Sequence, residues 1–126
     1  MNFLKGKFDE INTSKVEKNI KDNLNNEKQL IILVTGGCFN PVHLMHIDMF
    51  NIAKKNLDSE KLEVVGGFLI PTNNNYVREK LGKEAITLKH RNEMIELAIE
   101  SSDFICNFPL GYTNGSNTTI INTNII

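Results

Sequence analysis

Hydrophobic residues along this chain gather in three short runs, and two stretches with helical spacing lie between them. The first run, residues 30–34, consists of Leu, Ile and Val and is followed by Thr35 and two glycines. A short continuous run of this kind predicts a strand that is buried on both faces. From His43 to Leu57 apolar residues recur at steps of three and four, which predicts a helix that ends before Asp58.

The second run, residues 62–70, has two glycines in its interior, Gly66 and Gly67. A glycine pair inside a strand is typical of a bulge, or of a close approach between the backbone and a neighbouring group. The run is followed by a polar stretch, residues 72–86, which predicts a loop longer than a plain connection needs.

A second helix and a third strand complete the pattern. Thr87 is suited to cap a helix that we expect to end near Ser101. A short apolar run at residues 104–108 predicts the third strand. The order strand, helix, strand, helix, strand predicts an α/β fold with right-handed parallel crossovers. Along the second helix lie Leu88, Arg91, Ile95 and Ala98 or Ile99.

The two ends of the chain differ from this alternating middle. Residues 1–28 are polar and mixed in charge, and their weak helical stripe predicts a frayed surface helix or a tail. Residues 111–126 carry no charge and are rich in Asn, Thr and Ile, as in low-complexity sequence. We therefore expect a polar N-terminal helix or tail at 1–28, a partial domain at 29–110 and an uncharged tail at 111–126.

Length and composition limit the classes of function. The 126 residues suffice for one domain, and no window holds 18 consecutive apolar residues, so we expect no membrane partner. Residues 1–12 are charged where a signal peptide needs an apolar stretch, which predicts a cytoplasmic or nuclear protein. The net charge of −1 gives no global basic field, so we expect no nucleic-acid partner. Cys38 and Cys106 are interpreted as reduced thiols.

The densest chemistry follows the first strand, in the segment GGCFNPVHLMH at residues 36–46. Its glycine pair lets backbone N–H groups face a ligand, and a helix that begins near His43 favours an anion at its first turn. His43 and His46 are three residues apart, so both imidazoles lie beside that anion site. These features predict a polyphosphate site. No third ligand has suitable spacing nearby, so we expect no metal held by the histidines.

The same segment carries a resemblance to a known family. The motif G-C-F-N-P-x-H-x-x-H, from Gly37 to His46, resembles the G-x-F-[DN]-P-x-[HT]-x-x-H signature of the nucleotidyltransferase superfamily with the HIGH-type motif. This resemblance implies a Rossmann-like parallel sheet of the nucleotidyltransferase type. Because it spans only about residues 30–105, we expect that only the N-terminal βαβαβ half is present, truncated at its C-terminus.

Further motifs narrow the resemblance. Met45 before the second histidine, VVGGFLIP at residues 64–71, Asn75-Tyr76 and Lys89-His90-Arg91 are similar to eukaryotic nicotinamide or nicotinate mononucleotide adenylyltransferases. The resemblance implies adenylyl transfer from ATP to nicotinamide or nicotinate mononucleotide in NAD biosynthesis, with release of pyrophosphate. It also implies Mg²⁺ that is held largely by substrate oxygens and water.

The resemblance assigns roles to named residues. It implies that the backbone at Gly37, Cys38 and Phe39 lines the ATP and mononucleotide site, with Cys38 a turn residue rather than a nucleophile. It implies that His43 and His46 are catalytic and donate hydrogen bonds to the phosphates, His46 nearest the α-phosphate.

The matching loop of the family carries basic residues that reach the phosphates. Arg78 or Lys80 would take that role here, and Tyr76 completes the expected binding residues.

Other interpretations remain open. The chain could be another nucleotidyltransferase, such as a phosphopantetheine adenylyltransferase or a cytidylyltransferase, or a catalytically inactive fragment that binds nucleotide. The family continues beyond the third strand with further strands, helices and a second ATP-binding motif, and it stacks the pyridine ring on a Trp that this chain lacks. With three strands alone, residues 30–34 form an open sheet edge, which favours pairing with a second chain as a homo-oligomer.

Overall fold

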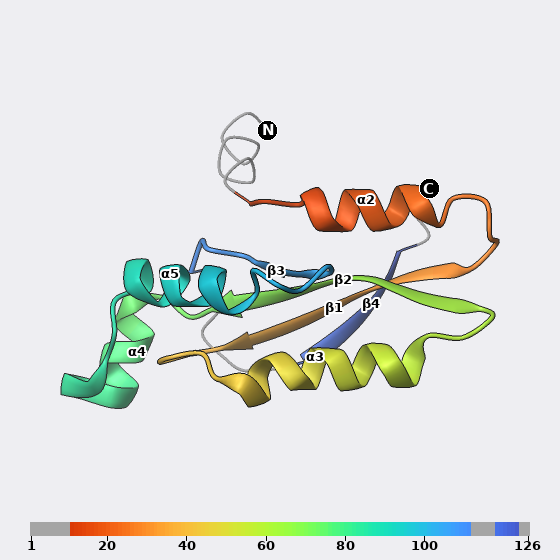
Figure 1. The fold of residues 1–126 in the computed structure, drawn as a ribbon. Helices are drawn as coiled ribbons and strands as arrows, with labels where there is room; N and C mark the ends of the chain where they lie inside the picture. The colour runs from red at the N-terminus through yellow and green to blue at the C-terminus, as the bar shows by residue number, and fades with distance from the viewer. Residues whose placement is uncertain (1–10, 112–117, 124–126) are drawn as a thin grey trace.

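The computed structural model describes residues 11–111 and 118–123, and these form one sheet with helices on both faces (Figure 1). The sheet has the order β3-β2-β1-β4, in which β1, β2 and β3 are parallel and β4 is antiparallel to β1. The strands are β1 (Gln29–Gly37), β2 (Leu62–Pro71), β3 (Ile105–Asn107) and β4 (Thr118–Thr123). The helices are α2 (Ser14–Asp22), α3 (Leu44–Leu57), α4 (Asn74–Leu81), the 3-10 turn η1 (Gly82–Glu84) and α5 (Leu88–Ala98).

The predicted α/β half with three parallel strands is confirmed. Helix α3 begins directly after His43, as expected, and links β1 to β2. Helix α5 links β2 to β3, and the Thr87 side chain accepts a hydrogen bond from the backbone N–H of His90 at 3.4 Å. This helix ends at Ala98, before the expected position near Ser101.

The main core lies between the sheet and helices α3 and α5. Phe50 of α3 and Ile95 of α5 are both buried there, and each large apolar side chain of this kind stabilises the fold by about 1.5–3 kcal/mol. From the sheet, the cluster takes Ile31, Leu33, Val64, Leu69 and Ile105. The two crossover helices therefore cover the same face of the sheet, as right-handed connections require.

The glycine pair inside β2 allows the close approach that was one of the two alternatives predicted for it. The register between β1 and β2 also shifts at Val65, directly before the pair. A Cβ on Gly66 would lie 2.5 Å from Val16 of α2, and a Cβ on Gly67 would lie 2.5 Å from the ring of Phe50. The two glycines thus let helices dock closely on opposite faces of the strand, as α2 and α3 do in Figure 1.

Helix α2 is anchored to the sheet, whereas a frayed surface helix or tail was expected. Val16 is buried, and the Lys15 ammonium donates to the carbonyls of Ile99 and Ile105, each at 2.8 Å. The Asn19 amide donates to the Val65 carbonyl at 2.9 Å. The division of the chain at residue 28 stays a prediction.

The loop expected at residues 72–86 is wrong, because α4 and η1 occupy most of it. Asn73 caps α4 by accepting a hydrogen bond from the Tyr76 backbone N–H at 2.8 Å. Val77 is completely buried, and Gly82 ends the helix with φ at 56°. The side-chain cap and the buried Val77 thus anchor a helix whose composition is polar.

The open edge expected along β1 is also wrong. Strand β4 pairs with β1 from Leu30 opposite Thr123 to Thr35 opposite Thr118. Its Thr and Ile residues are β-branched and favour a strand, although the segment was interpreted as low-complexity sequence. Among the described residues, no helix is both long and apolar enough to cross a bilayer.

Candidate functional site

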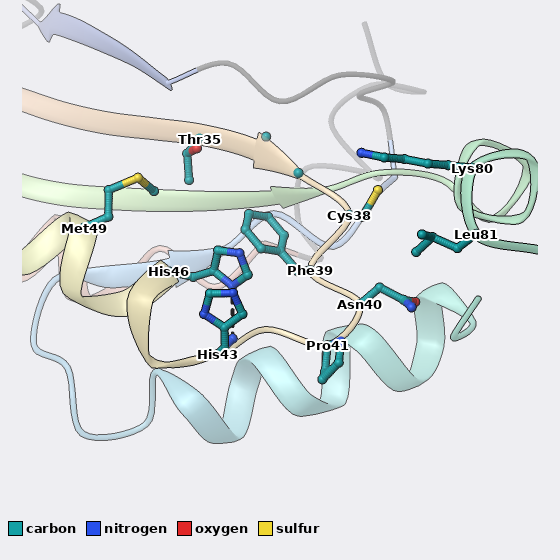
Figure 2. Close-up of a pocket in the computed structure, with 12 residues that line it drawn as sticks. Thr35, Cys38, Phe39, Asn40, Pro41, His43, His46, Met49, Lys80 and Leu81 are labelled. Atoms are coloured by element: carbon teal, nitrogen blue, oxygen red, sulfur yellow. Dashed lines mark hydrogen bonds between the residues drawn. The ribbon is translucent and has the colours of Figure 1, made fainter. Parts of the chain in front are cut away.

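A cavity of about 520 Å³ opens where β1 ends (Figure 2). In open α/β sheets, ligands bind in the crevice beyond the carboxyl ends of the strands. The walls are residues 35–41, His43, His46 and Met49, with Lys80 and Leu81 from α4. The predicted phosphate segment and a helix that follows β2 therefore enclose one space.

The loop after β1 adopts a strained conformation at Phe39, whose φ is 45°. For a bulky residue other than glycine this left-handed region costs about 1–2 kcal/mol. The ring is buried, and a Cβ on Gly37 would lie 3.2 Å from its Cζ. Gly37 therefore leaves the space that the Phe39 ring needs beneath the cavity.

The two histidines form a stacked pair at the start of α3. Their ring centroids are 3.7 Å apart with an interplanar angle of 21°, and the His46 ring meets the Phe39 ring edge-on at 4.8 Å (Figure 2). The backbone N–H of His43 donates to Nδ1 of His46 at 3.0 Å. Because Nδ1 accepts, the proton of a neutral His46 ring is on Nε2, where it can be donated to a ligand.

Burial lowers the pKa of His46, and the neighbouring His43 lowers it further. The ring is therefore neutral at pH 7 in the free protein. An anionic ligand would raise this pKa, since it favours the imidazolium form.

The first turn of α3 supplies further donors. The helix has 14 residues and carries no acidic residue in its first turn. Its unpaired N–H groups and the positive end of its dipole favour an anion. Of the first turn, His46 lines the cavity, and its backbone N–H already donates to the His43 carbonyl at 3.0 Å, so the dipole and the imidazole are what this turn offers to an anion at the cavity wall.

Most of the residues expected at the site line this cavity. They are Gly37, Cys38, Phe39, His43, His46 and Lys80. Arg78 lies instead at a separate cavity of about 90 Å³, and its guanidinium donates to Asn75 at 2.7 Å. Tyr76 is not among the described residues that line the larger cavity. The structure therefore separates Arg78 and Tyr76 from the other expected residues.

Two residues that the sequence analysis did not assign to the site hold its loop in place. The Asn40 side chain donates to the Glu84 carbonyl and accepts from the Ile86 N–H, both at 2.7 Å. Arg91 is completely buried, and its guanidinium donates to the carbonyls of Ile86 at 2.8 Å and Cys38 at 2.9 Å. The available signal was an arginine four residues before the buried Ile95, on the core-facing side of a helix.

The donor set at the cavity does not fit a metal held by the protein alone. Its described lining contains no carboxylate, and carboxylate oxygens are the protein ligands that Mg²⁺ prefers. In the described part of the chain, no three His, Cys, Asp or Glu side chains form a group that could hold a metal ion.

Comparison with known proteins relates the chain to nucleotidyltransferases. The cytidylyltransferase-like family model matches residues 34–123. A nicotinamide/nicotinic acid mononucleotide adenylyltransferase from Arabidopsis thaliana is 37% identical over 79 residues, which are 63% of this chain and 32% of that protein. A protein of the same name from rice (Oryza sativa subsp. japonica) is 37% identical, over 63% of this chain and 30% of its own length. The Xenopus tropicalis protein 2 of that name is 35% identical, over 62% and 24%. The chain thus spans about a third or less of these relatives.

Proposed function

This chain belongs to the cytidylyltransferase-like family, and from this we propose that it binds ATP at the cavity beyond β1 and transfers the adenylyl group to nicotinamide or nicotinate mononucleotide. The observation that carries the proposal is the stacked histidine pair at the N-terminus of α3, beside a glycine-ended strand. The names of the relatives support the choice of acceptor.

In the proposed reaction, a phosphate oxygen of the mononucleotide attacks the α-phosphorus of ATP. The bond from the α-phosphorus to the bridging oxygen breaks, and pyrophosphate leaves with the bond's electrons. No covalent enzyme intermediate is needed, so the protein acts by positioning and by stabilising charge. Mg²⁺ enters with the phosphates of ATP as part of the substrate, in keeping with a lining that lacks carboxylates.

The geometry supports the following roles. The Nε2–H of His46 donates to a phosphoryl oxygen while charge builds up on the leaving pyrophosphate. His43 stacks on this ring and fixes it through its backbone N–H. The positive end of the α3 dipole favours a second phosphate at its first turn, and Lys80 adds a positive charge from the α4 side of the cavity.

An assay of NAD formation with the purified chain, in parallel with ATP calorimetry, tests the proposal. We expect His46→Ala to lower turnover by at least about 100-fold, because one donor to the transition state is lost. His90→Ala is the matched control, since His90 is exposed on α5 and is not part of the described cavity lining. Equal rates for the wild type and His46→Ala would rule out the role of His46.

A second candidate is a module that binds nucleotide without turnover. It would use the same cavity beyond β1 and the same His46 donor. ATP binding that is lost in His46→Ala, with no NAD formed by the wild type, would support it. Preference for CTP over ATP, or for phosphopantetheine as acceptor, would favour another nucleotidyltransferase.

A further inference from the structure

Arg91 is a buried cation without a described counter-ion. Its side chain is fully enclosed, and no carboxylate in the described residues forms an ion pair with it. Its Nη2 is buried and has no hydrogen-bond partner in the described structure. Burying an unpaired charge is costly, so a role outside core packing is needed to explain an arginine at this position.

The guanidinium fixes the direction of a peptide group beside the cavity. Nη1 holds the Cys38 carbonyl, and Nε holds the Ile86 carbonyl. In a trans peptide the C=O and N–H groups point in opposite directions, so the Phe39 N–H points away from Arg91. The Thr72 N–H likewise donates a hydrogen bond to the Gly37 carbonyl at 2.9 Å. Because this carbonyl points towards the end of β2, the Cys38 N–H of the same peptide points away from it.

The strained residue lies between two attachments. Arg91 holds the carbonyl before Phe39, and the Asn40 side chain after it is bound to Glu84 and Ile86. Strained backbone persists only where its surroundings over-determine it. These hydrogen bonds supply that restraint, and they lead to η1, to α5 and to the link between them.

We propose that Arg91 is a positioning residue of the phosphate loop, residues 36–41. It holds the Cys38 carbonyl on the protein side, so that the amides of the loop face the bound phosphates, and a polyphosphate across the loop offsets its buried charge. This inference rests on the proposed function for the identity of the ligand, whereas the restraint of the loop is independent of it.

Cys38 provides a direct readout, because it lies in the loop and is partly exposed, whereas Cys106 is buried. Alkylation of each thiol by iodoacetamide is followed by mass spectrometry, with and without ATP, and ATP affinity is measured by calorimetry. The variants are Arg91→Met, which removes both hydrogen bonds, and Arg91→Lys, which keeps the charge. Lys89→Met is the matched control, since it removes the same charge from an exposed position on the same helix.

We expect Arg91→Met to raise the ATP Kd by about tenfold or more, and to speed alkylation of Cys38 but not of Cys106. We expect Arg91→Lys to change the ATP Kd and the rate of Cys38 alkylation less than Arg91→Met does, and Lys89→Met to change neither quantity. General destabilisation would expose both thiols together. If Arg91→Met does not fold, Asn40→Ala removes the second attachment of the loop at a half-buried position. We expect this variant also to speed alkylation of Cys38.

The outcomes separate the two proposals. If ATP neither binds nor protects Cys38 in the wild type while Arg91→Met still speeds its alkylation, the proposed function fails and the restraint by Arg91 stands. If Arg91→Met matches the wild type in Cys38 alkylation and in ATP affinity, or exposes both cysteines alike, the role of Arg91 is overturned.

Discussion

Two glycine pairs in this chain share a sequence and differ in purpose. Gly66-Gly67 lies inside β2, where Val16 and Phe50 occupy the space that side chains would take on either face. Gly36-Gly37 ends β1 and lines the cavity, and the atoms nearest to the missing Cβ of Gly37 belong to the ring of Phe39. The first pair permits close packing of helices, whereas the second leaves backbone open to a ligand. The use of a glycine therefore depends on what its absent side chain would contact.

The largest effect is expected at Gly67. In Gly67→Val the new side chain would collide with the Phe50 ring, which lies 2.5 Å from the Cβ position. We expect a loss of about 3 kcal/mol in the free energy of unfolding, measured by urea denaturation.

Gly82→Ala is the control for this variant. Nothing lies within 4 Å of its Cβ position, so only the strain of its φ of 56° remains. We expect a loss of about 1 kcal/mol. Equal losses in both variants would contradict the packing role of Gly67.

A smaller and different effect is expected at Gly37. In Gly37→Ala the Phe39 ring, 3.2 Å from the Cβ position, must move by a few tenths of an ångström. We expect the free energy of unfolding to change by less than about 1 kcal/mol, while the ATP Kd rises about threefold or more because the loop shifts. Calorimetry and urea denaturation of the same sample measure both. If Gly37→Ala loses stability and keeps its ATP affinity, Gly36-Gly37 serves packing as Gly66-Gly67 does, and the proposed difference between the two glycine pairs is contradicted.

Local sequence pattern predicted the elements around the Gly66-Gly67 pair better than it predicted α4 and β4. The alternation of strands and helices, the β2 glycines and the start of α3 beside His43 followed from local pattern alone. Helix α4 did not, because its only fully buried residue is Val77 in an otherwise polar stretch. The pairing of β4 with β1 did not either, since a strand's partner depends on distant residues.

Arg91 shows the same limit at the site. Its spacing before Ile95 placed it on the core-facing side of α5, but a helical pattern gives no information about which distant carbonyl an arginine reaches. The bond to Cys38 joins residues that are 53 positions apart. The loop that we propose binds phosphate could be recognised from local sequence, whereas the side chains that hold it could be found only in the structure.

The smallest expected effect is a dependence of stability on pH at His46, which lines the same cavity as Gly36-Gly37. Since the pKa of His46 is lowered in the folded protein, its contribution to stability is complete above its unfolded pKa, about 6.5. That contribution is lost as the pH falls through the lower folded pKa, when protonation removes the acceptor for the His43 N–H. Thermal unfolding between about pH 5 and pH 7.5 should show a decline towards acid that is weaker in His46→Ala.

An NMR titration of the His46 ring gives the site-specific check on this pH effect. We expect added ATP to raise the pKa of His46. A pKa at or above the usual value in the free protein would contradict the neutral ring.

The pairing of β4 with β1 has a consequence for the order of folding. Strands β1 and β2 are joined by a single helix, so their pairing closes a short loop and can form early. Strand β4 pairs with the other edge of β1, although β2, α5 and β3 lie between these two strands in the sequence. Contacts between such distant segments form slowly because closing a long loop carries a larger entropic barrier. We therefore expect amide hydrogen exchange to protect the β1–β2 ladder before the β1–β4 ladder during refolding.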